Sequence, residues 1–112
     1  MNNIPVSNVR NFVLMGHSQS GKTTLADALL HQLGVSPTMG SVDEGSSLCD
    51  FNPEEKDRKQ TIWCKPFSGV YKTTGGVETQ ITFVDAPGFV DFYGQVVAAS
   101  RAADTGLIVV DA

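Results

Sequence analysis

The chain of 112 residues is 41% hydrophobic and 18% charged, the composition of an ordinary globular domain that is small for a nucleotide-binding α/β fold. Its formal net charge of -4 argues against a broad basic surface, so we expect no direct nucleic-acid site in this segment. We also expect no membrane partner and a cytoplasmic location, because no apolar run has the length of a membrane span and residues 1–5 lack the features of a signal peptide.

The first predicted elements are a strand and a helix joined by a glycine-rich loop. Residues 9–15 are apolar nearly throughout, which is typical of a strand covered on both faces of a parallel sheet. Apolar residues at helical spacing predict a helix from about Lys22 to Leu33, which Gly34 ends. Between them, residues 16–23 read G-x-x-x-x-G-K-T, the pattern of a phosphate-binding P-loop, in the context that this motif requires.

Anion binding is the physical reason for the P-loop pattern. The backbone N–H groups of such a loop and the positive end of the following helix dipole converge on the β-phosphate of a nucleotide. Lys22 then bridges the β- and γ-phosphate oxygens, and the Thr23 hydroxyl binds Mg²⁺. The alternative is a Gly/Ser-rich turn that opens a helix, but such a turn has no need of the Lys-Thr pair. The residues predicted to contact the nucleotide here are His17, Ser18, Gln19, Ser20, Gly21, Lys22, Thr23 and Thr24.

Helical and strand periodicity are both missing from Val35 to about Thr61. Glycines, prolines and a run of mixed charges predict a long loop there, which is either functional or disordered and is where a mobile switch would lie. Two cysteines, Cys49 and Cys64, lie in or beside this loop. They lack C-x-x-C spacing and a nearby His cluster, which favours reduced structural thiols over a disulfide or a zinc site.

Residues 63–71 and 80–84 predict two strands of a hairpin, joined by a polar turn that contains glycine. The second strand ends in the sequence Asp85-Ala86-Pro87-Gly88. An Asp at the carboxyl end of an apolar strand, downstream of a P-loop, is placed near Mg²⁺. Gly88 offers a backbone N–H that can approach the γ-phosphate without a Cβ in the way. Taken alone, the D-x-P-G pattern could be a β-turn.

Short segments spread along the chain occur in the order and spacing of a known family. They are residues 10–13, 16–23, 50–51, 58–62, 85–88, 90–92 and 106–112. Together they resemble the start of the G domain of elongation factor G and its relatives among the translational GTPases, from about residue 9 to the end of the chain.

The resemblance implies two switch segments. Switch I spans about residues 35–62, where Thr61 closes on Mg²⁺ and the γ-phosphate when GTP is bound, and switch II begins at Asp85. The implied metal ligands are Thr23, Thr61 and Asp85. The residues implied to serve hydrolysis are Lys22, Thr61 and Gly88, and both Asp85 and Gly88 join the nucleotide-binding set.

Three positions depart from the family pattern. Ribosomal members carry a His after D-x-P-G that positions the attacking water, whereas this chain has Phe89, as the elongation factor G-like side branch has an aromatic residue there. Because a Phe cannot hydrogen-bond to water, hydrolysis would rest on Lys22, Mg²⁺ and backbone N–H groups. Gln19 stands where the family usually has Asp, and Lys59 stands where it usually has Gly.

A helix over residues 93–103 and a buried strand over residues 107–110 complete the predicted elements. The predicted fold class is α/β: a three-layer P-loop NTPase fold whose mostly parallel sheet has one antiparallel edge hairpin and is truncated after the fourth strand. The base-specificity motifs N-K-x-D and S-A-[LK] do not occur, so we expect residues 1–112 to be the N-terminal portion of a G domain.

The predicted function is a GTP-binding and GTP-hydrolysing switch of the elongation factor class, with GTP or GDP and Mg²⁺ as cofactors. The ribosome is a partner by resemblance only. Two alternatives stay open at this point. One is a nucleotide-binding interaction module with little or no hydrolysis, which Phe89 and Gln19 favour, and the other is a P-loop ATPase or small-molecule kinase.

Overall fold

The structure, a computed structural model, describes residues 3–88 and 92–112. Its elements in chain order are η1 (Val6–Asn8), β1 (Val9–Met15), α1 (Lys22–Gln32), α2 (Pro53–Arg58), β2 (Lys65–Lys72), β3 (Glu78–Asp85), α3 (Tyr93–Ala102) and β4 (Thr105–Ile108). None of the helices in these two ranges combines the length and the hydropathy that crossing a membrane requires. Phe89, on which one prediction rests, lies outside the described residues.

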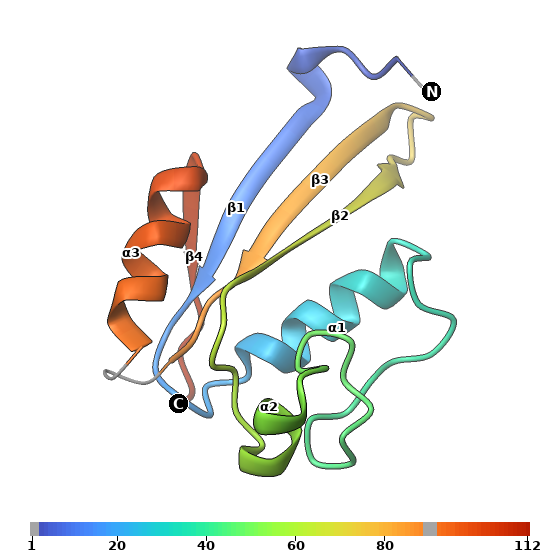
Figure 1. The fold of residues 1–112 in the computed structure, drawn as a ribbon. Coiled ribbons are helices and arrows are strands. Elements are labelled where there is room, and N and C mark those ends of the chain that lie inside the picture. Colours follow the sequence, from blue (N-terminus) through green and yellow to red (C-terminus); the bar gives the residue numbers. More distant parts are fainter. Residues whose placement is uncertain (1–2, 89–91) are drawn as a thin grey trace.

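The described strands form one mixed sheet in the order β2-β3-β1-β4 (Figure 1). β1 runs parallel to both β3 and β4, with Val13 opposite Val84 and Gly106, whereas β2 and β3 pair as an antiparallel hairpin. The predicted mostly parallel sheet with one antiparallel edge hairpin is therefore confirmed. Because β1 and β3 are parallel neighbours, the segments that follow their carboxyl ends meet at one edge of the sheet.

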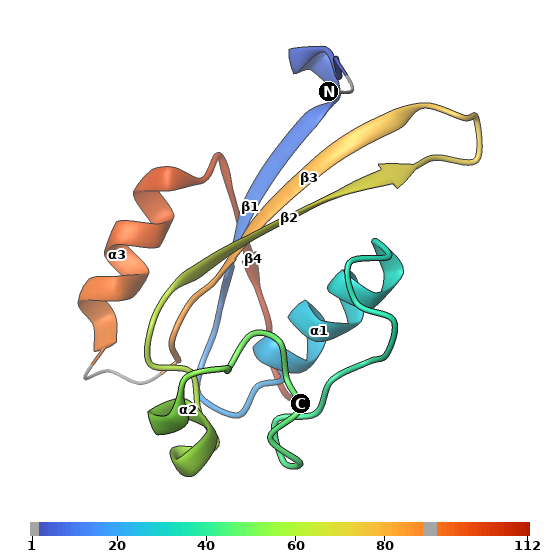
Figure 2. The same ribbon diagram turned by 45° about the vertical axis from the view of Figure 1, so that its right-hand side comes forward.

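Helices cover both faces of this sheet, α1 on one side and α3 on the other (Figures 1 and 2). On the α1 face, Leu14 and Phe83 are fully buried against Leu30. On the α3 face, Val13 packs with Ala99. The neighbours Val13 and Leu14 thus point into opposite layers, as successive strand residues must, which explains why β1 is apolar on both faces.

The helix after the P-loop ends as the sequence predicts. Gly34 follows α1 with φ 72°, and its N–H donates to the carbonyl of His31 at 3.0 Å. The N–H of Val35 donates to the carbonyl of Leu30, also at 3.0 Å. These two bonds form a Schellman motif, which needs a left-handed residue after the helix and therefore favours glycine there.

The prediction of a continuous loop from residue 35 to about residue 61 is wrong in one part, because this segment contains the short helix α2. Pro53 is at the start of this helix, followed by two glutamates in its first turn, and Lys56 and Arg58 lie in its last turn. Acids near the N-terminus and bases near the C-terminus of a helix are both favoured by the helix dipole. The sequence alone favours a loop at this point because six residues are too few to display helical periodicity.

The last strand differs from the prediction in both position and burial. β4 begins two residues before the predicted range 107–110, and all four of its residues are exposed, with Ile108 at 68%. The prediction of a buried strand is wrong because β4 is the edge of the described sheet. Among residues 3–88 and 92–112 it has β1 beside it and no strand on its other side.

Candidate functional site

The P-loop leaves the end of β1 and enters α1 with Lys22 folded back into the loop. The buried Lys22 ammonium group donates a hydrogen bond to the carbonyl of His17 at 2.7 Å and lies 3.5 Å from the Ser20 hydroxyl. Burial lowers the pKa of Lys22, and the nearby Asp85 carboxylate opposes that shift. The ammonium group hydrogen-bonds to neutral acceptors here, and a phosphate oxygen would give it stronger, charge-assisted bonds.

Gly88 brings the segment after β3 into direct contact with this loop. A Cβ built onto Gly88 would lie 2.5 Å from both the Lys22 ammonium nitrogen and the backbone nitrogen of Ser18. A real Cβ cannot approach backbone atoms so closely. Only glycine permits this approach, which places the Gly88 backbone beside the P-loop.

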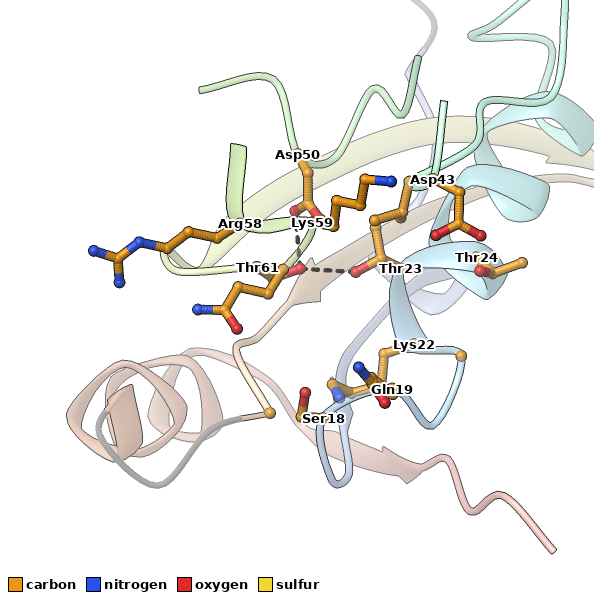
Figure 3. A pocket seen from close by; sticks show the side chains of 14 residues that line it. Ser18, Gln19, Lys22, Thr23, Thr24, Asp43, Asp50, Arg58, Lys59 and Thr61 are labelled. Carbon is orange, nitrogen blue, oxygen red and sulfur yellow. Dashed lines mark hydrogen bonds between the residues drawn. The ribbon is translucent and has the colours of Figure 1, made fainter. Parts of the chain in front are cut away.

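Side-chain oxygen atoms of Thr23, Thr61 and Asp50, which come from separate segments, meet at the end of the P-loop where α1 begins (Figure 3). The hydroxyl oxygens of Thr23 and Thr61 are 2.8 Å apart. Thr23 donates to a carboxylate oxygen of Asp85 at 3.0 Å, and Thr61 donates to Asp50 at 2.8 Å. The start of α1, the loop around α2 and the end of β3 therefore converge on one point.

The oxygen atoms of this cluster make more short contacts with one another than there are hydroxyl hydrogens to bridge them. The hydroxyls of Thr23 and Thr61 carry one hydrogen each, whereas the cluster contains three contacts of 2.8 to 3.0 Å. If Thr23 donates to Asp85 and Thr61 to Asp50, no hydrogen lies between the two threonines. Such a contact between two oxygens is favourable only when a further proton or a cation lies close to both.

The two carboxylates of the cluster are poor in partners. Burial, the main cause, raises the pKa of Asp85 to about 7, and the Asp50 carboxylate adds to the shift while the Thr23 hydrogen bond opposes it. Burial also raises the pKa of Asp50, against the effect of its bond to Thr61. Within residues 3–88 and 92–112, one oxygen of each, Oδ1 of Asp85 and Oδ2 of Asp50, is buried with no hydrogen-bond partner.

These observations fit a divalent cation with a preference for oxygen ligands. Adjacent ligands of octahedral Mg²⁺, each about 2.0–2.1 Å from the ion, lie about 2.9 Å apart, close to the spacing of the Thr23 and Thr61 oxygens. The described part of the chain has no group of three or more His, Cys, Asp or Glu side chains arranged to hold a metal. The donor set is thus hydroxyls plus one or two carboxylates, which suits Mg²⁺ bound jointly with phosphate oxygens.

An open cavity of about 540 Å³ lies over the cluster (Figure 3). It is lined by Ser18, Gln19, Gly21, Lys22, Thr23, Thr24, Val42, Asp43, Asp50, Arg58, Lys59, Gln60, Thr61 and Gly88. Its volume is in the range typical of small-molecule sites. The cavity therefore joins the P-loop to the loop around α2 and to the segment after β3.

Most of the residues that the sequence predicts for the site line this cavity, and three do not. Asp85 does not line it but accepts a hydrogen bond from Thr23, which does. The His17 ring is exposed and contacts the Ser18 carbonyl at 2.8 Å, so this residue contributes its backbone to the loop. The Ser20 hydroxyl lies 3.5 Å from the ammonium group of Lys22.

The structure also places here several residues whose role the sequence does not predict. Asp50 is the most important, since it accepts the Thr61 hydroxyl hydrogen inside the protein. The others are Val42, Asp43, Arg58, Lys59 and Gln60, all in the predicted long loop. Two signals were available: the length of that loop, which marks it as functional, and the family resemblance of residues 50–51 and 58–62, which does not itself give Asp50 a contact.

Two of the departures from the family pattern fall on left-handed backbone. Lys59 caps the end of α2 with φ 51° and ψ 41°, and Gln19 has φ 62° in the P-loop. Glycine adopts this conformation without strain, and Asp and Asn tolerate it better than other residues do. The family's usual Gly and Asp at these positions thus match the backbone that this chain forms with Lys and Gln.

The amino-acid sequence is similar to one protein family model and to curated proteins related to it. A family model described as the elongation factor Tu GTP binding domain matches residues 7–112. The chain is 41% identical over 104 residues to an elongation factor G-like protein of Mycobacterium tuberculosis. It is 37% identical over 109 residues to elongation factor G of Pseudothermotoga lettingae.

Solved structures agree with the sequence comparison. The fold is similar to the crystal structure of a protein from Thermus thermophilus, with a TM-score of 0.83 and 35% identity over 92% of this chain. The alignments cover 93% and 97% of this chain for the two curated relatives, but only 14% and 15% of those proteins. For the Thermus structure the share is 15%. The chain therefore spans less than a fifth of the length of these relatives.

Proposed function

Because the chain belongs to the elongation factor Tu GTP-binding domain family of translational GTPases, we propose that it is the N-terminal portion of a G domain that binds and hydrolyses GTP. The proposal assigns residues 16–23 to the P-loop, residues 35–62 to switch I and the segment from Asp85 to switch II. The observation that carries it is the convergence of Thr61 and Asp85 on Thr23, the last residue of the P-loop.

The P-loop would bind the phosphates of GTP or GDP. Backbone N–H groups of residues 17–24 and the N-terminus of α1 face the phosphates, as in other P-loops. Lys22 exchanges its bond to the His17 carbonyl for β- and γ-phosphate oxygens, and there it stabilises the charge that develops during hydrolysis. Because Gly88 has no Cβ of its own, its backbone N–H can approach the γ-phosphate without a steric clash.

The groups that would hold Mg²⁺ are the side chains of Thr23, Thr61 and Asp85. In support of this assignment, one carboxylate oxygen of Asp85 has no hydrogen-bond partner within residues 3–88 and 92–112. When bound, the ion neutralises charge between the β- and γ-phosphates. Asp50 supports the site by accepting the Thr61 hydroxyl hydrogen, which fixes the direction in which the lone pairs of that oxygen point.

The switch action follows from the segments that carry these groups. Thr61 belongs to the loop around α2, and Gly88 belongs to the segment after β3. Both contact the γ-phosphate in the triphosphate state, so its loss on hydrolysis releases both segments. By similarity to elongation factors, the partner that senses this change is the ribosome, and the protein acts in the cytoplasm.

The test is calorimetric titration of the full-length protein with GDP, a non-hydrolysable GTP analogue and ATP, with Mg²⁺ and with EDTA. We expect a preference for guanine nucleotides and a triphosphate affinity that falls when Mg²⁺ is removed. Lys22→Ala should weaken triphosphate binding by about 10- to 100-fold because it removes a charged donor. Lys56→Ala, on the exposed side of α2, is the matched control and should leave binding unchanged.

Tight ATP binding without a preference for guanine would overturn the proposal and favour a P-loop ATPase. A second measurement on the same protein distinguishes a GTPase that turns over from a module that binds the nucleotide but hardly hydrolyses it. The module is the alternative that the replacement of the usual His by Phe89 favours. Single-turnover GTP hydrolysis is measured with and without ribosomes in the natural protein and in Phe89→His. A large gain in the variant alone would indicate that the natural protein is built for slow turnover.

A further inference from the structure

A buried ion pair lies beside the proposed switch site without belonging to it. Glu55 of α2 is fully buried, and its carboxylate oxygen Oε2 pairs with the ammonium group of Lys65 at the start of β2. Lys65 is itself only 8% exposed. Neither side chain lines the cavity, so neither is positioned to contact a nucleotide.

Glu55 uses its other carboxylate oxygen to hold the backbone that follows Thr61. Oε1 accepts hydrogen bonds from the N–H of Ile62 at 3.0 Å and from the N–H of Trp63 at 3.1 Å. Neither of these amides is part of a helix or strand. One side chain thus provides the acceptor for two consecutive amides directly after the threonine whose hydroxyl contacts Thr23.

Lys65 extends the restraint to the other end of the same loop. Its ammonium group also donates to the carbonyl of Cys49, the residue before Asp50, and lies 4.4 Å from the centre of the Phe51 ring. The hydrogen bond between Asp50 and Thr61 is therefore bracketed on both sides. Lys65 fixes the backbone before Asp50, and Glu55 fixes the backbone after Thr61.

The anchor of this arrangement is the sheet. Lys65 is the first residue of β2, and it pairs in register with Asp85 at the end of β3. The ion pair therefore connects α2 to the carboxyl end of β3, where Asp85 accepts a hydrogen bond from Thr23. Moving α2 away from the sheet would break the ion pair, both amide bonds and the placement of Thr61 together.

We propose that Glu55 and Lys65 are positioning residues that hold Thr61 in the conformation that receives the γ-phosphate and Mg²⁺. The inference rests on the proposed function, because it concerns the same site. It assigns the pair to the triphosphate state in particular, since a diphosphate offers Thr61 no γ-phosphate. Loss of the restraint should therefore weaken binding of a triphosphate and spare binding of a diphosphate.

A purely structural role predicts something different. Replacing a buried ion pair by apolar residues of similar size is often neutral or even stabilising, because the desolvation of two charges is avoided. If Glu55 and Lys65 only fill space, such a replacement leaves nucleotide selectivity unchanged. If Glu55 acts by accepting the two amides, the effect depends on whether position 55 keeps an acceptor oxygen.

Two double variants of the full-length protein separate these roles. The first, Glu55→Leu with Lys65→Met, removes both charges and the acceptor. The second, Glu55→Gln with Lys65→Met, also removes both charges but keeps an acceptor oxygen for Ile62 and Trp63. Thr61→Ala is measured beside them, and thermal unfolding without nucleotide verifies that each variant is folded. If the leucine variant does not fold, Glu55→Met with Lys65→Met makes the same comparison.

The readout is the ratio of the dissociation constants for GDP and a non-hydrolysable GTP analogue, measured by calorimetry with Mg²⁺ present. The leucine variant should weaken binding of the analogue about tenfold, which is the effect of losing one or two buried hydrogen bonds, while GDP binding stays within about twofold. The glutamine variant should recover most of the ratio, and Thr61→Ala should lower the ratio as the leucine variant does.

The outcomes that overturn the inference are distinct from failure of the proposed function. An unchanged ratio in the leucine variant, with Thr61→Ala lowering it, refutes the positioning role alone. Equal weakening of both nucleotides in the leucine and glutamine variants also refutes it, because the effect would then be one of general stability. A natural protein that does not prefer guanine nucleotides overturns both proposals.

Discussion

Gly88 joins the segment after β3 to the P-loop because it carries no side chain. A methyl group there would overlap the Ser18 backbone, which cannot give way as the flexible end of Lys22 can. We expect Gly88→Ala to push this segment outward and to weaken binding of a GTP analogue about tenfold, the effect of losing one charge-assisted hydrogen bond, with little change for GDP.

A matched control for this substitution is available in α3. Among residues 3–88 and 92–112, and leaving aside the backbone of its own helix, Gly94 has no atom within 4 Å of the position that a Cβ would take, so Gly94→Ala adds the same methyl group without a clash there. Calorimetric titration of both variants makes the comparison. Equal effects of the two substitutions, or weaker GDP binding in Gly88→Ala, would contradict the role given to this close approach.

Residues of the site differ in how far the sequence could predict them. Lys22 and Thr23 are given by a local pattern, because the loop that binds phosphate must place them at fixed offsets from two glycines. Asp50 could not be given a role in this way. Its contact is with the Thr61 hydroxyl, which only folding of the intervening α2 brings within 2.8 Å.

At the scale of elements, α2 ends in a strained residue. Lys59 caps this helix in the left-handed conformation, which costs a residue with a Cβ about 1–2 kcal/mol relative to glycine. We expect Lys59→Gly to stabilise α2 and the adjoining Thr61 segment locally by about 1 kcal/mol. Hydrogen exchange of the amides of residues 54–63 should become slower by about fivefold, as that free energy requires.

The control for this prediction lies one turn earlier in the same helix. Lys56→Gly removes a similar exposed side chain from the helix interior, where glycine destabilises by roughly 1 kcal/mol. Exchange in the same peptide should then become faster. If both substitutions change exchange in the same direction, the backbone conformation at Lys59 does not limit the stability of α2.

Elements with a strong periodic pattern were predictable, and α2 was not. β1 and α1 carry apolar residues at the spacing that each structure requires, and Gly34 marks the end of α1. α2 has six residues, of which Glu55 is the one buried, and the partner of Glu55 is Lys65 in the next strand. A short helix held by a tertiary ion pair shows no apolar periodicity in its own sequence, although its proline and its charges at the two ends fit a helix.

At the scale of the whole molecule, the described sheet presents an apolar edge. Leu107, Ile108 and Val110 are 44%, 68% and 78% exposed, and among the described residues no strand pairs with the outer side of β4. Exposed apolar edge strands favour pairing with other chains. We expect the 112-residue chain prepared alone to self-associate, and Ile108→Lys to reduce the associated fraction in analytical ultracentrifugation.

Val6→Lys is the control for that prediction, since Val6 is 88% exposed in η1, outside the sheet. It adds the same charge and should leave self-association unchanged. Equal improvement in both variants would mean that net charge, rather than the β4 edge, controls association. The burial of β4 was predicted wrongly because it depends on neighbouring elements, which the sequence of the strand itself does not specify.

The network of contacts around Glu55 has one more consequence. Trp63, whose backbone N–H is held by that carboxylate, is the single tryptophan among these 112 residues, and its side chain is 48% exposed. An indole ring at the boundary between protein and water changes its emission wavelength and intensity when that boundary moves. Residues 1–112 therefore carry an intrinsic optical reporter two positions from Thr61, and a change in the conformation of this loop can be followed in real time without a dye.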